Sequence, residues 1–505
     1  MSAPSSTQDF DSKHEKQYES DTTHVQTTTG GVGETHRKLK NRHIVFIGIG
    51  SGIGTGLFVG TGAALANAGP LGLLLAFLVT GMILYSVMQA IGELATLIPT
   101  AGSFPHFATR FLSPSVGFAL GINYWYCYSI AIASELSAAA TLVGYWTDLT
   151  PAVTISVGLV AVVGLNMCSV RWFGESEVFT ASIKVITFLG LIILGIVLDL
   201  GGGPSHDRLG FRYWKAPWGP FAPFAGVGGG AKSNFLAFFS AFVNAAFTYI
   251  GTECVVLGAG EAANPSKSIP KATRRVLWRI VFFSGIPALP SIVNAAILTS
   301  AWSAANSYLF VSSRILVGMA IDRQLPACFA RVNRQGVPYY AVGFSALFGL
   351  FAYLSLGTGG PAQAFTWLLT LSTVAGLIAW ATLCLCFIRF EKACRVQGVD
   401  RKEFAFCSPW QPYSAWFGFV GSVIITIFQG FSVFIKGNWK TTDFISSYIG
   451  IALYFVPMLV WHLYYRCSFV RASEIDLFSG RMNPEDEVEE VEPTTFLGKV
   501  VDKLL

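Results

Sequence analysis

The chain has little charge and lacks the residue clusters that carry chemistry in enzymes. Only 12% of its 505 residues are charged and 52% are hydrophobic, whereas an average soluble domain has about 25% charged residues. Four of the seven histidines lie in the first 43 residues, and the other three are scattered. The nine cysteines show neither a disulfide framework nor the spacing of metal ligands. These absences argue against an enzyme, a bound metal and a cofactor.

Basic residues are too dispersed to indicate a nucleic-acid partner. The formal net charge is +5, and the Lys and Arg residues lie in short loops beside apolar runs, which is the positive-inside pattern of membrane proteins. Residues 1–43 are polar and contain no apolar run of the kind found in a cleaved signal peptide. We therefore expect a disordered, cytoplasmic N-terminal tail over 1–43 and a second cytoplasmic tail over 466–505.

Long apolar runs fill the region 44–465 between these tails. A helix needs about 20 apolar residues to cross a bilayer, so the sequence predicts an all-α, multi-pass membrane protein embedded in lipid. Spans are predicted at 44–66, 71–98, 115–146, 152–170, 177–200, 235–258, 339–357, 364–388, 413–435 and 444–465.

The first apolar run is rich in glycine at its centre, with Gly48, Gly50, Gly52, Gly54, Gly56, Gly60 and Gly62. Glycine costs roughly 1 kcal/mol against alanine inside a helix, and opened backbone is tolerated at membrane depth only where it lines a cavity. The pattern predicts a discontinuous helix whose backbone faces a polar ligand. Close packing of small residues against another helix is the alternative. A dinucleotide site is excluded because the GxGxxG spacing is not met around Gly52.

The sixth span repeats this pattern. Phe247 to Glu253 reads FTYIGTE and places a glycine among small polar residues in mid-span. Two interrupted spans, each the first of a five-span half, are typical of inverted-repeat transporters with a site at the repeat interface.

Four charged residues stand inside or at the end of apolar runs: Glu93, Glu135, Lys184 and Glu253. Such residues are costly in lipid and usually face a cavity or a partner. A structural ion pair or a snorkelling terminal residue is the alternative for each, and it carries equal weight for Glu93 and Glu135.

The segment 280–313 is anomalous. Basic residues flank it on both sides, so an even number of spans should lie between them, yet two crossings need about 40 residues and a turn. One crossing, a re-entrant hairpin and missing sequence are the three explanations, and we favour missing sequence.

The combined motifs resemble the fungal amino acid permeases of the amino acid/polyamine/organocation superfamily. The resemblance is carried by IGSGIGTGLFVGTG at 49–62, GELATLIPTAGSF at 92–104, FTYIGTE at 247–253, EAANPSKSIPKA at 261–272, LPSIVNAAILTSAWSAANS at 289–307 and VPY at 337–339. Loop segments at 201–214, 390–406 and 473–481 are similar to those of dicarboxylic amino acid permeases.

The resemblance implies an inverted five-plus-five repeat with two extra C-terminal helices, of which about 11 of about 12 spans are present. It also implies proton-coupled symport of amino acids at the plasma membrane, with a cytoplasmic N-terminus. The expected substrate-binding residues are Gly52, Ile53, Gly54, Thr55, Gly56, Phe247 and Ile250, and the expected proton-coupling residues are Lys184 and Glu253.

Each expected residue has a role in that comparison. The amides of Gly54, Thr55 and Gly56 would bind the substrate carboxylate, and carbonyl groups near Gly52, Ile53, Phe247 and Ile250 would receive the ammonium. Phe247 would cover the substrate. Lys184 matches a lysine that stands at the sodium position of sodium-independent relatives, and Glu253 would anchor the broken helix or share in coupling.

Several alternatives stay open at this point. Acidic amino acids (glutamate, aspartate) are one expected substrate class, and a broad or neutral specificity is the other. Relatives carry roughly 40 more residues after the position of Phe283, the length of about two spans. A transport-inactive splice or gene-model variant, or an amino acid sensor of the same fold, is therefore also expected as an alternative. A channel is disfavoured, because no ring of like charges is visible.

Overall fold

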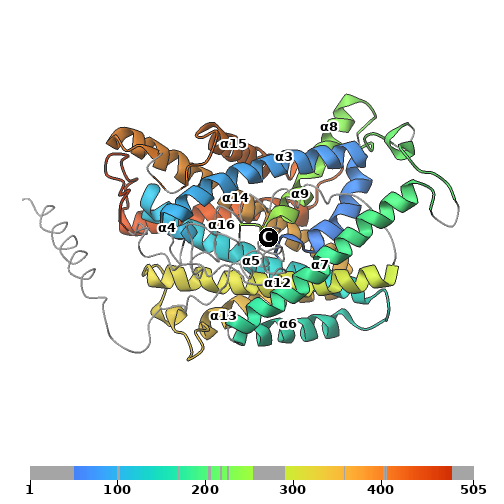
Figure 1. Ribbon diagram of the computed structural model, residues 1–505, viewed down its shortest axis with the longest axis horizontal. Coiled ribbons are helices and arrows are strands. Elements are labelled where there is room, and N and C mark those ends of the chain that lie inside the picture. Colours follow the sequence, from blue (N-terminus) through green and yellow to red (C-terminus); the bar gives the residue numbers. More distant parts are fainter. Residues whose placement is uncertain are drawn as a thin grey trace, which may run out of the picture.

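The computed structural model describes residues 51–98, 103–168, 170–202, 206–216, 219–224, 227–253, 290–357, 359–401, 404 and 406–479. Every regular element within these ranges is helical (Figure 1). The long helices are α3 (Thr61–Leu97), α5 (Pro114–Val143), α6 (Pro151–Met167), α7 (Val170–Asp199), α12 (Pro290–Ile321), α14 (Gly360–Gln397), α15 (Tyr413–Phe428) and α16 (Thr441–Tyr465). The shorter ones are η1 (Gly56–Gly60), α4 (Ser103–Phe111), η2 (Arg212–Trp214), α8 (Ala231–Ser240), α9 (Phe242–Tyr249), η4 (Ala327–Ala330), α13 (Tyr339–Leu347), η5 (Phe348–Leu356) and η7 (Phe431–Phe434). The predicted tail 1–43 and the acidic end of the second tail lie outside the described residues.

The helices confirm the all-α membrane class. In the described part of the chain, eight helical segments are long and apolar enough to cross a bilayer, and α6 is a shorter apolar helix. From Gly56 onward, the first predicted span and the second form one run to Leu97 that bends at Gly69, where φ is +73° and Pro70 follows. A Cβ atom at Gly69 would lie 2.5 Å from the amide nitrogen of Ala222. Glycine is therefore required at this bend on both conformational and steric grounds.

The segment 280–313 is not a re-entrant hairpin where it is described. Residues 290–321 form the single helix α12, with Pro290 at its first position. Proline is well tolerated there because its missing amide hydrogen has no partner in a helix start. One crossing between two basic segments leaves the charge distribution unbalanced. The predicted junction after Phe283 lies outside the described residues.

Helix α5 is the centre of the bundle and packs against α12, α14, α4 and α16 (Figure 1). Most of its side chains are buried, and many of them are small. Small residues allow the backbones of membrane helices to approach closely, and polar groups then bond across the interface. Asn123 on α5 illustrates this, because its amide donates to the carbonyl oxygen of Ala375 on α14 at 2.8 Å. By contrast, α7 and α16 expose long apolar side chains along their outer faces.

The first part of the predicted C-terminal tail packs against the bundle. Val470 donates its amide to the carbonyl of Leu112, and Ile475 and Leu477 are buried. Arg389 of α14 donates to the carbonyl of Val470. Arg110 of α4 donates to the carbonyl of Asp476 at 2.6 Å. Residues 466–479 thus connect the ends of α4 and α14, and we call them the C-terminal strap.

Candidate transport site

Two helix interruptions lie against each other near the middle of the molecule. The first is at Ile53 and Gly54, where the chain leaves helical geometry before η1. The second follows the end of α9, where Ile250 is extended with ψ of 134° and Gly251 has φ of +104°. The hydroxyl of Ser51 donates to the carbonyl of Gly251 at 2.7 Å. A side chain at the first interruption therefore bonds to the backbone that follows α9, which brings the two predicted breaks into contact.

Side chains from neighbouring helices hold the first interruption open. Ser300 on α12 donates its hydroxyl to the carbonyl of Ile53 at 2.7 Å, and Tyr308 donates to the carbonyl of Ser51 at 3.1 Å. The amide of Thr55 donates to Oε2 of Glu135 on α5 at 3.3 Å. Backbone groups that a continuous helix would pair internally are thus satisfied from outside, as the low dielectric of a membrane interior requires.

Glu135 lies at the position expected for a substrate carboxylate. A Cβ atom on Gly54 would lie 2.7 Å from Glu135 Oε1, and this oxygen has no hydrogen-bond partner among the described residues. The carboxylate of Glu135 therefore contacts the same backbone that is expected to receive a ligand. Glycine at position 54 leaves the space that this close approach needs.

Glu253 organises the second interruption. Its carboxylate is fully buried and accepts hydrogen bonds from the hydroxyls of Tyr124 at 2.8 Å and Tyr128 at 3.0 Å. Its second oxygen accepts the amide of Gly251 at 3.1 Å. A carboxylate that caps an unwound amide and is held by two tyrosines has the geometry of an anchor, which is one of the two roles expected for it.

Phe247 lies directly beside the first interruption. Its ring belongs to α9 and is 2% exposed. A Cβ atom on Gly56 would lie 2.6 Å from it, and the ring of Phe365 packs edge-on at a centroid distance of 6.3 Å. The structure therefore brings Gly52 to Gly56, Phe247 and Ile250 together in one place.

Lys184 lies on α7 and is fully buried. Its ammonium interacts electrostatically with two carboxylates, Glu177 on the same helix and Glu135 on α5. Glu177 was missed by the sequence reasoning. The signal was present, because residues 177 and 184 are seven apart and so share one face of a helix. The glutamate stands near the start of an apolar run, where it was not distinguished from a terminal residue.

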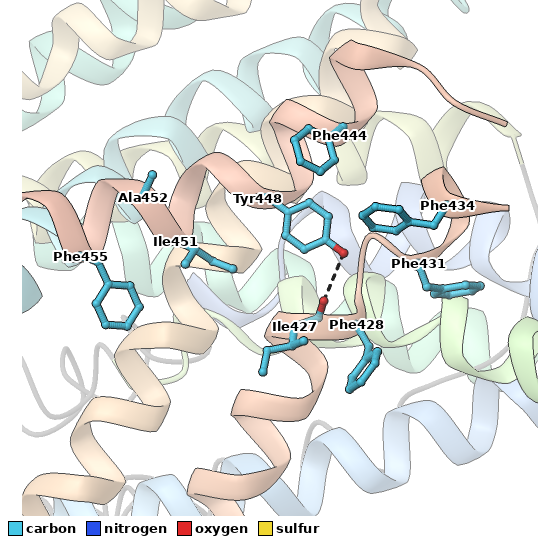
Figure 2. A pocket seen from close by; sticks show the side chains of 9 residues that line it. All are labelled: Ile427, Phe428, Phe431, Phe434, Phe444, Tyr448, Ile451, Ala452 and Phe455. Atoms are coloured by element: carbon cyan, nitrogen blue, oxygen red, sulfur yellow. Dashed lines mark hydrogen bonds between the residues drawn. The ribbon is translucent and has the colours of Figure 1, made fainter.

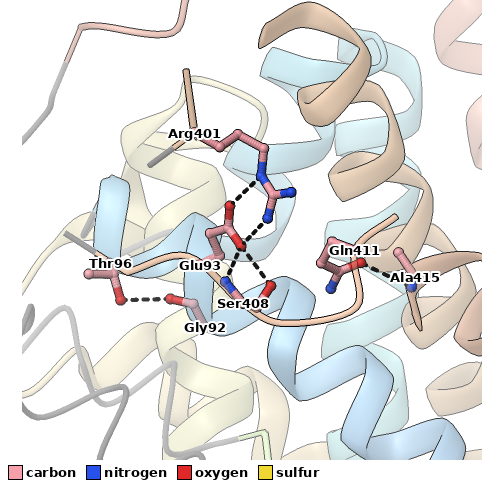
Figure 3. A network of polar contacts seen from close by, with 7 residues as sticks. All are labelled: Gly92, Glu93, Thr96, Arg401, Ser408, Gln411 and Ala415. Atoms are coloured by element: carbon pink, nitrogen blue, oxygen red, sulfur yellow. Dashed lines mark hydrogen bonds and ion pairs between the residues drawn. The ribbon is translucent and has the colours of Figure 1, made fainter. Parts of the chain in front are cut away.

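Glu93 has a structural role at the end of α3 (Figure 3). Its carboxylate is 1% exposed and forms a bidentate ion pair with Arg401, in which Nε and Nη2 donate to Oε1 and Oε2 at 2.9 and 2.8 Å. Both the amide and the hydroxyl of Ser408 donate to it, at 2.8 and 2.6 Å. Burial lowers the pKa of Arg401, and the hydrogen bonds and charge of Glu93 outweigh this and leave that pKa raised. The ion-pair alternative stated for Glu93 is what the structure shows.

An apolar cavity of about 700 Å³ lies between α15, η7 and α16, away from the helix interruptions (Figure 2). It is lined by Ile427, Phe428, Phe431, Phe434, Phe444, Tyr448, Ile451, Ala452 and Phe455. The hydroxyl of Tyr448 is occupied, because it donates to the carbonyl of Ile427 at 3.2 Å. This lining suits hydrocarbon and offers no charged group to an amino acid.

Within the described residues, these features define a helical membrane transporter in which the first helix interruption faces the unwound end of α9. The chain belongs to the amino acid permease family, whose model matches residues 43–284 and 281–474. It is 38% identical to the proline-specific permease of Saccharomyces cerevisiae over 536 residues, covering 94% of this chain and 84% of that one. It is 36% identical to the dicarboxylic amino acid permease of the same yeast over 497 residues, covering 90% and 81%.

A solved structure shares the fold. A variant of the manganese transporter of Eremococcus coleocola superposes with a TM-score of 0.50 and 14% identity, covering 86% of this chain and 97% of that one. At this level of identity the likeness concerns the fold alone, and it supports the predicted inverted-repeat transporter architecture.

The alignments also bear on the anomalous segment. The family model matches in two pieces that meet at residues 281–284. The alignment with the dicarboxylic permease is 497 positions long and covers 90% of this 505-residue chain, which is about 455 residues. About 40 of the aligned positions are therefore gaps in this chain. The break in the family match lies next to Phe283, and the extra length after this residue stays a prediction.

Proposed function

We propose that this amino acid permease takes up amino acids across the plasma membrane by proton symport, with its N-terminus in the cytoplasm. The observation that carries the proposal is the contact between the two interrupted helices, in which the hydroxyl of Ser51 donates to the carbonyl of Gly251. Unwound backbone at a repeat interface supplies amides for an anion and carbonyl groups for a cation. A zwitterionic amino acid presents both charges.

The proposed binding residues are Gly52, Ile53, Gly54, Thr55, Gly56, Phe247 and Ile250. In this arrangement the substrate carboxylate takes the place of the Glu135 carboxylate at the amide of Thr55. Glu135 then moves towards Lys184, with which it already interacts electrostatically. Lys184 is the proposed proton-coupling residue, and Glu253 is assigned the anchoring role that its contacts support.

For the substrate class, the charges around the interruptions favour a neutral amino acid. Three carboxylates (Glu135, Glu177 and Glu253) and one ammonium (Lys184) are buried in this region among the described residues. An acidic side chain would add a fourth negative charge to a low-dielectric site, which is unfavourable without a further cation. Acidic substrates are the second candidate, and the loop resemblance to dicarboxylic permeases supports them.

The domain organisation is part of the proposal. Residues 1–43 and 466–505 are assigned to cytoplasmic tails, and residues 44–465 to the membrane permease domain, which is shortened around 280–290. A transcript with an in-frame exon after Phe283 would establish a gene-model origin for the shortening. A sequenced transcript without it would leave a chain whose second repeat lacks a helix, and then a transport-inactive variant or a sensor becomes the better description.

Uptake of labelled amino acids into yeast cells that lack their own permeases tests the proposal. Competition by proline, glutamate, alanine and lysine would identify the substrate class. Thr55→Trp fills the space at the first interruption, where Thr55 is fully buried, and we expect uptake to be abolished. The matched control is Thr366→Trp on the exposed face of α14, which should keep normal uptake. Full uptake by the Thr55 variant would contradict the site.

A further inference from the structure

Glu177 lies on the inward face of α7, seven residues or about two helical turns before Lys184. Its side chain is fully buried, and seven residues correspond to a rise of about 10 Å along a helix. The carboxylate therefore stands below Lys184, nearer the end of α7 at Arg171, which the charge distribution places towards the cytoplasm. Nothing in the substrate-binding scheme above uses this residue.

The hydrogen bonds of Glu177 leave one carboxylate oxygen open. Ser303 on α12 donates its hydroxyl to Oε1 at 2.7 Å, and Thr180 donates to the hydroxyl of Ser303 at 3.0 Å. Oε2 has no hydrogen-bond partner of ordinary geometry among the described residues, and the polar side chains of Asn306 and Ser307 are close enough to interact with the carboxylate. Buried polar atoms are normally satisfied, so an open oxygen on a buried acid needs an explanation. A proton bound at Oε2 would let it donate to the Ser307 hydroxyl, whose oxygen also has no hydrogen-bond partner among the described residues, without disturbing the bond from Ser303.

Among the described residues, Lys184 is the charged group that acts on the Glu177 carboxylate. Lys184 is on the same helix as Glu177, and Glu135 approaches the same ammonium from α5. From α6 the polar neighbour is the neutral Asn166, which bonds to Asn306 of α12 at 2.7 Å. Lys184 thus lies within electrostatic reach of a carboxylate on α5 and a carboxylate on α7.

An aromatic pair lies between Glu177 and the Arg171 end of α7. The rings of Phe173 and Phe310 stack with centroids 4.1 Å apart and planes inclined by 5°. The guanidinium of Arg314 on α12 lies 3.9 Å from the centroid of Phe310. Phe173 is buried and one helical turn from Glu177. This apolar layer separates the carboxylate from the end of the helix.

We propose that Glu177 is the proton acceptor that follows Lys184 in the coupling route of this permease. In the step an N–H bond of the Lys184 ammonium breaks, water relays the proton across the gap between the two side chains, and an O–H bond forms at Oε2 of Glu177. The products are a neutral amine and a neutral carboxyl group. When the Phe173 and Phe310 rings part, Glu177 releases the proton to water on that side, and Lys184 is reprotonated through Glu135. The proposal rests on the proposed symport function and adds its inner proton site.

The test compares two transport modes in proteoliposomes that contain the full chain. The first is accumulation of the labelled amino acid that the wild type transports, driven by an imposed inward proton gradient. The second is exchange of labelled for unlabelled amino acid at equal pH, which needs no net proton movement. In Glu177→Gln we expect gradient-driven accumulation to fall by about 100-fold, the lower end of the loss expected when an acid–base group is removed. Exchange should stay near the wild-type rate.

Asp199→Asn, an exposed acid at the other end of the same helix, is the matched control and should behave as wild type in both modes. Glu177→Asp, which keeps the acid, should restore part of the accumulation. If the Gln variant retains gradient-driven accumulation, or loses both modes in equal proportion, the assignment of Glu177 is wrong. If the wild type exchanges amino acid but ignores the proton gradient, proton symport itself fails, and the inference fails with it.

Discussion

The substitution Gly251→Ala, which adds a single methyl group, tests the contact between the two interrupted helices. Gly251 has φ of +104°, a region that non-glycine residues rarely occupy. A Cβ atom there would lie 2.8 Å from the carbonyl oxygen and 3.1 Å from the Cβ of Ser51. That carbonyl also accepts the hydroxyl of Tyr308 at 3.1 Å, so it cannot move away without weakening a second contact.

The expected effect on uptake follows from the positive φ of Gly251 and from its close contact with Ser51. Holding alanine in such a backbone conformation costs about 1–3 kcal/mol. The contact with Ser51 adds to this, because the obstructing atom is backbone. If the interruption shifts to relieve the strain, the backbone groups proposed to bind substrate lose their alignment, and a displacement of about 1 Å costs roughly 100-fold in rate. We expect initial uptake to fall by at least about tenfold at equal surface expression.

The measurement is initial uptake of labelled substrate, normalised to the amount of permease at the cell surface. Gly343→Ala is the control, because a Cβ atom at this helical glycine meets no atom within 4 Å. It should leave uptake unchanged. Wild-type uptake by the Gly251 variant would show that the close contact between the interruptions is not needed, and would refute the reasoning behind the site.

Two further predictions concern stability and the C-terminal strap. Glu93→Gln leaves Arg401 without its charge partner and should lower the free energy of unfolding by about 3–5 kcal/mol, measured by thermal unfolding of the detergent-solubilised protein. The control is Glu391→Gln, whose partner Arg395 is exposed, and it should cost about 0.5 kcal/mol. Equal losses in the two variants would argue against the role of Glu93. Partial burial raises the pKa of Asp476, but hydrogen bonds from Ser479 and Phe478 outweigh it and leave that pKa lowered. A carboxyl group whose pKa is lowered in the folded protein adds stability at pH values above its pKa in the unfolded chain. The strap should therefore resist proteolysis at neutral pH and become more susceptible as acid protonates Asp476. Resistance that does not change in acid would contradict this.

The membrane class and the location of the helix interruptions follow from local sequence. Apolar length predicts spans because lipid offers no hydrogen bonds to an open backbone. The glycines at 52, 54 and 56, and the FTYIGTE segment, marked the two interruptions because breakers in mid-span need a cavity or a partner. The bend before Pro70 was also readable, since Ala68 to Pro70 lie between the predicted spans 44–66 and 71–98, and this is where α3 changes direction.

Partner choice was not readable in the same way. Glu93, Glu135 and Glu253 looked alike as single acids in apolar runs, yet the structure gives them an arginine, a backbone amide and two tyrosines as partners. Glu177 was overlooked because its significance depends on Ser303, which is 126 residues away in the chain. The attachment of the strap to α4 and α14 likewise depends on contacts between distant segments.

The sequence by itself therefore determined that this chain is a multi-pass helical permease and where its helices are interrupted, because both properties depend on local hydrophobicity and backbone freedom. Only the tertiary structure decided which carboxylate binds backbone, which neutralises an arginine and which stands beside Lys184. The role of a buried charge is set by the groups that surround it, and these come from helices far apart in the chain.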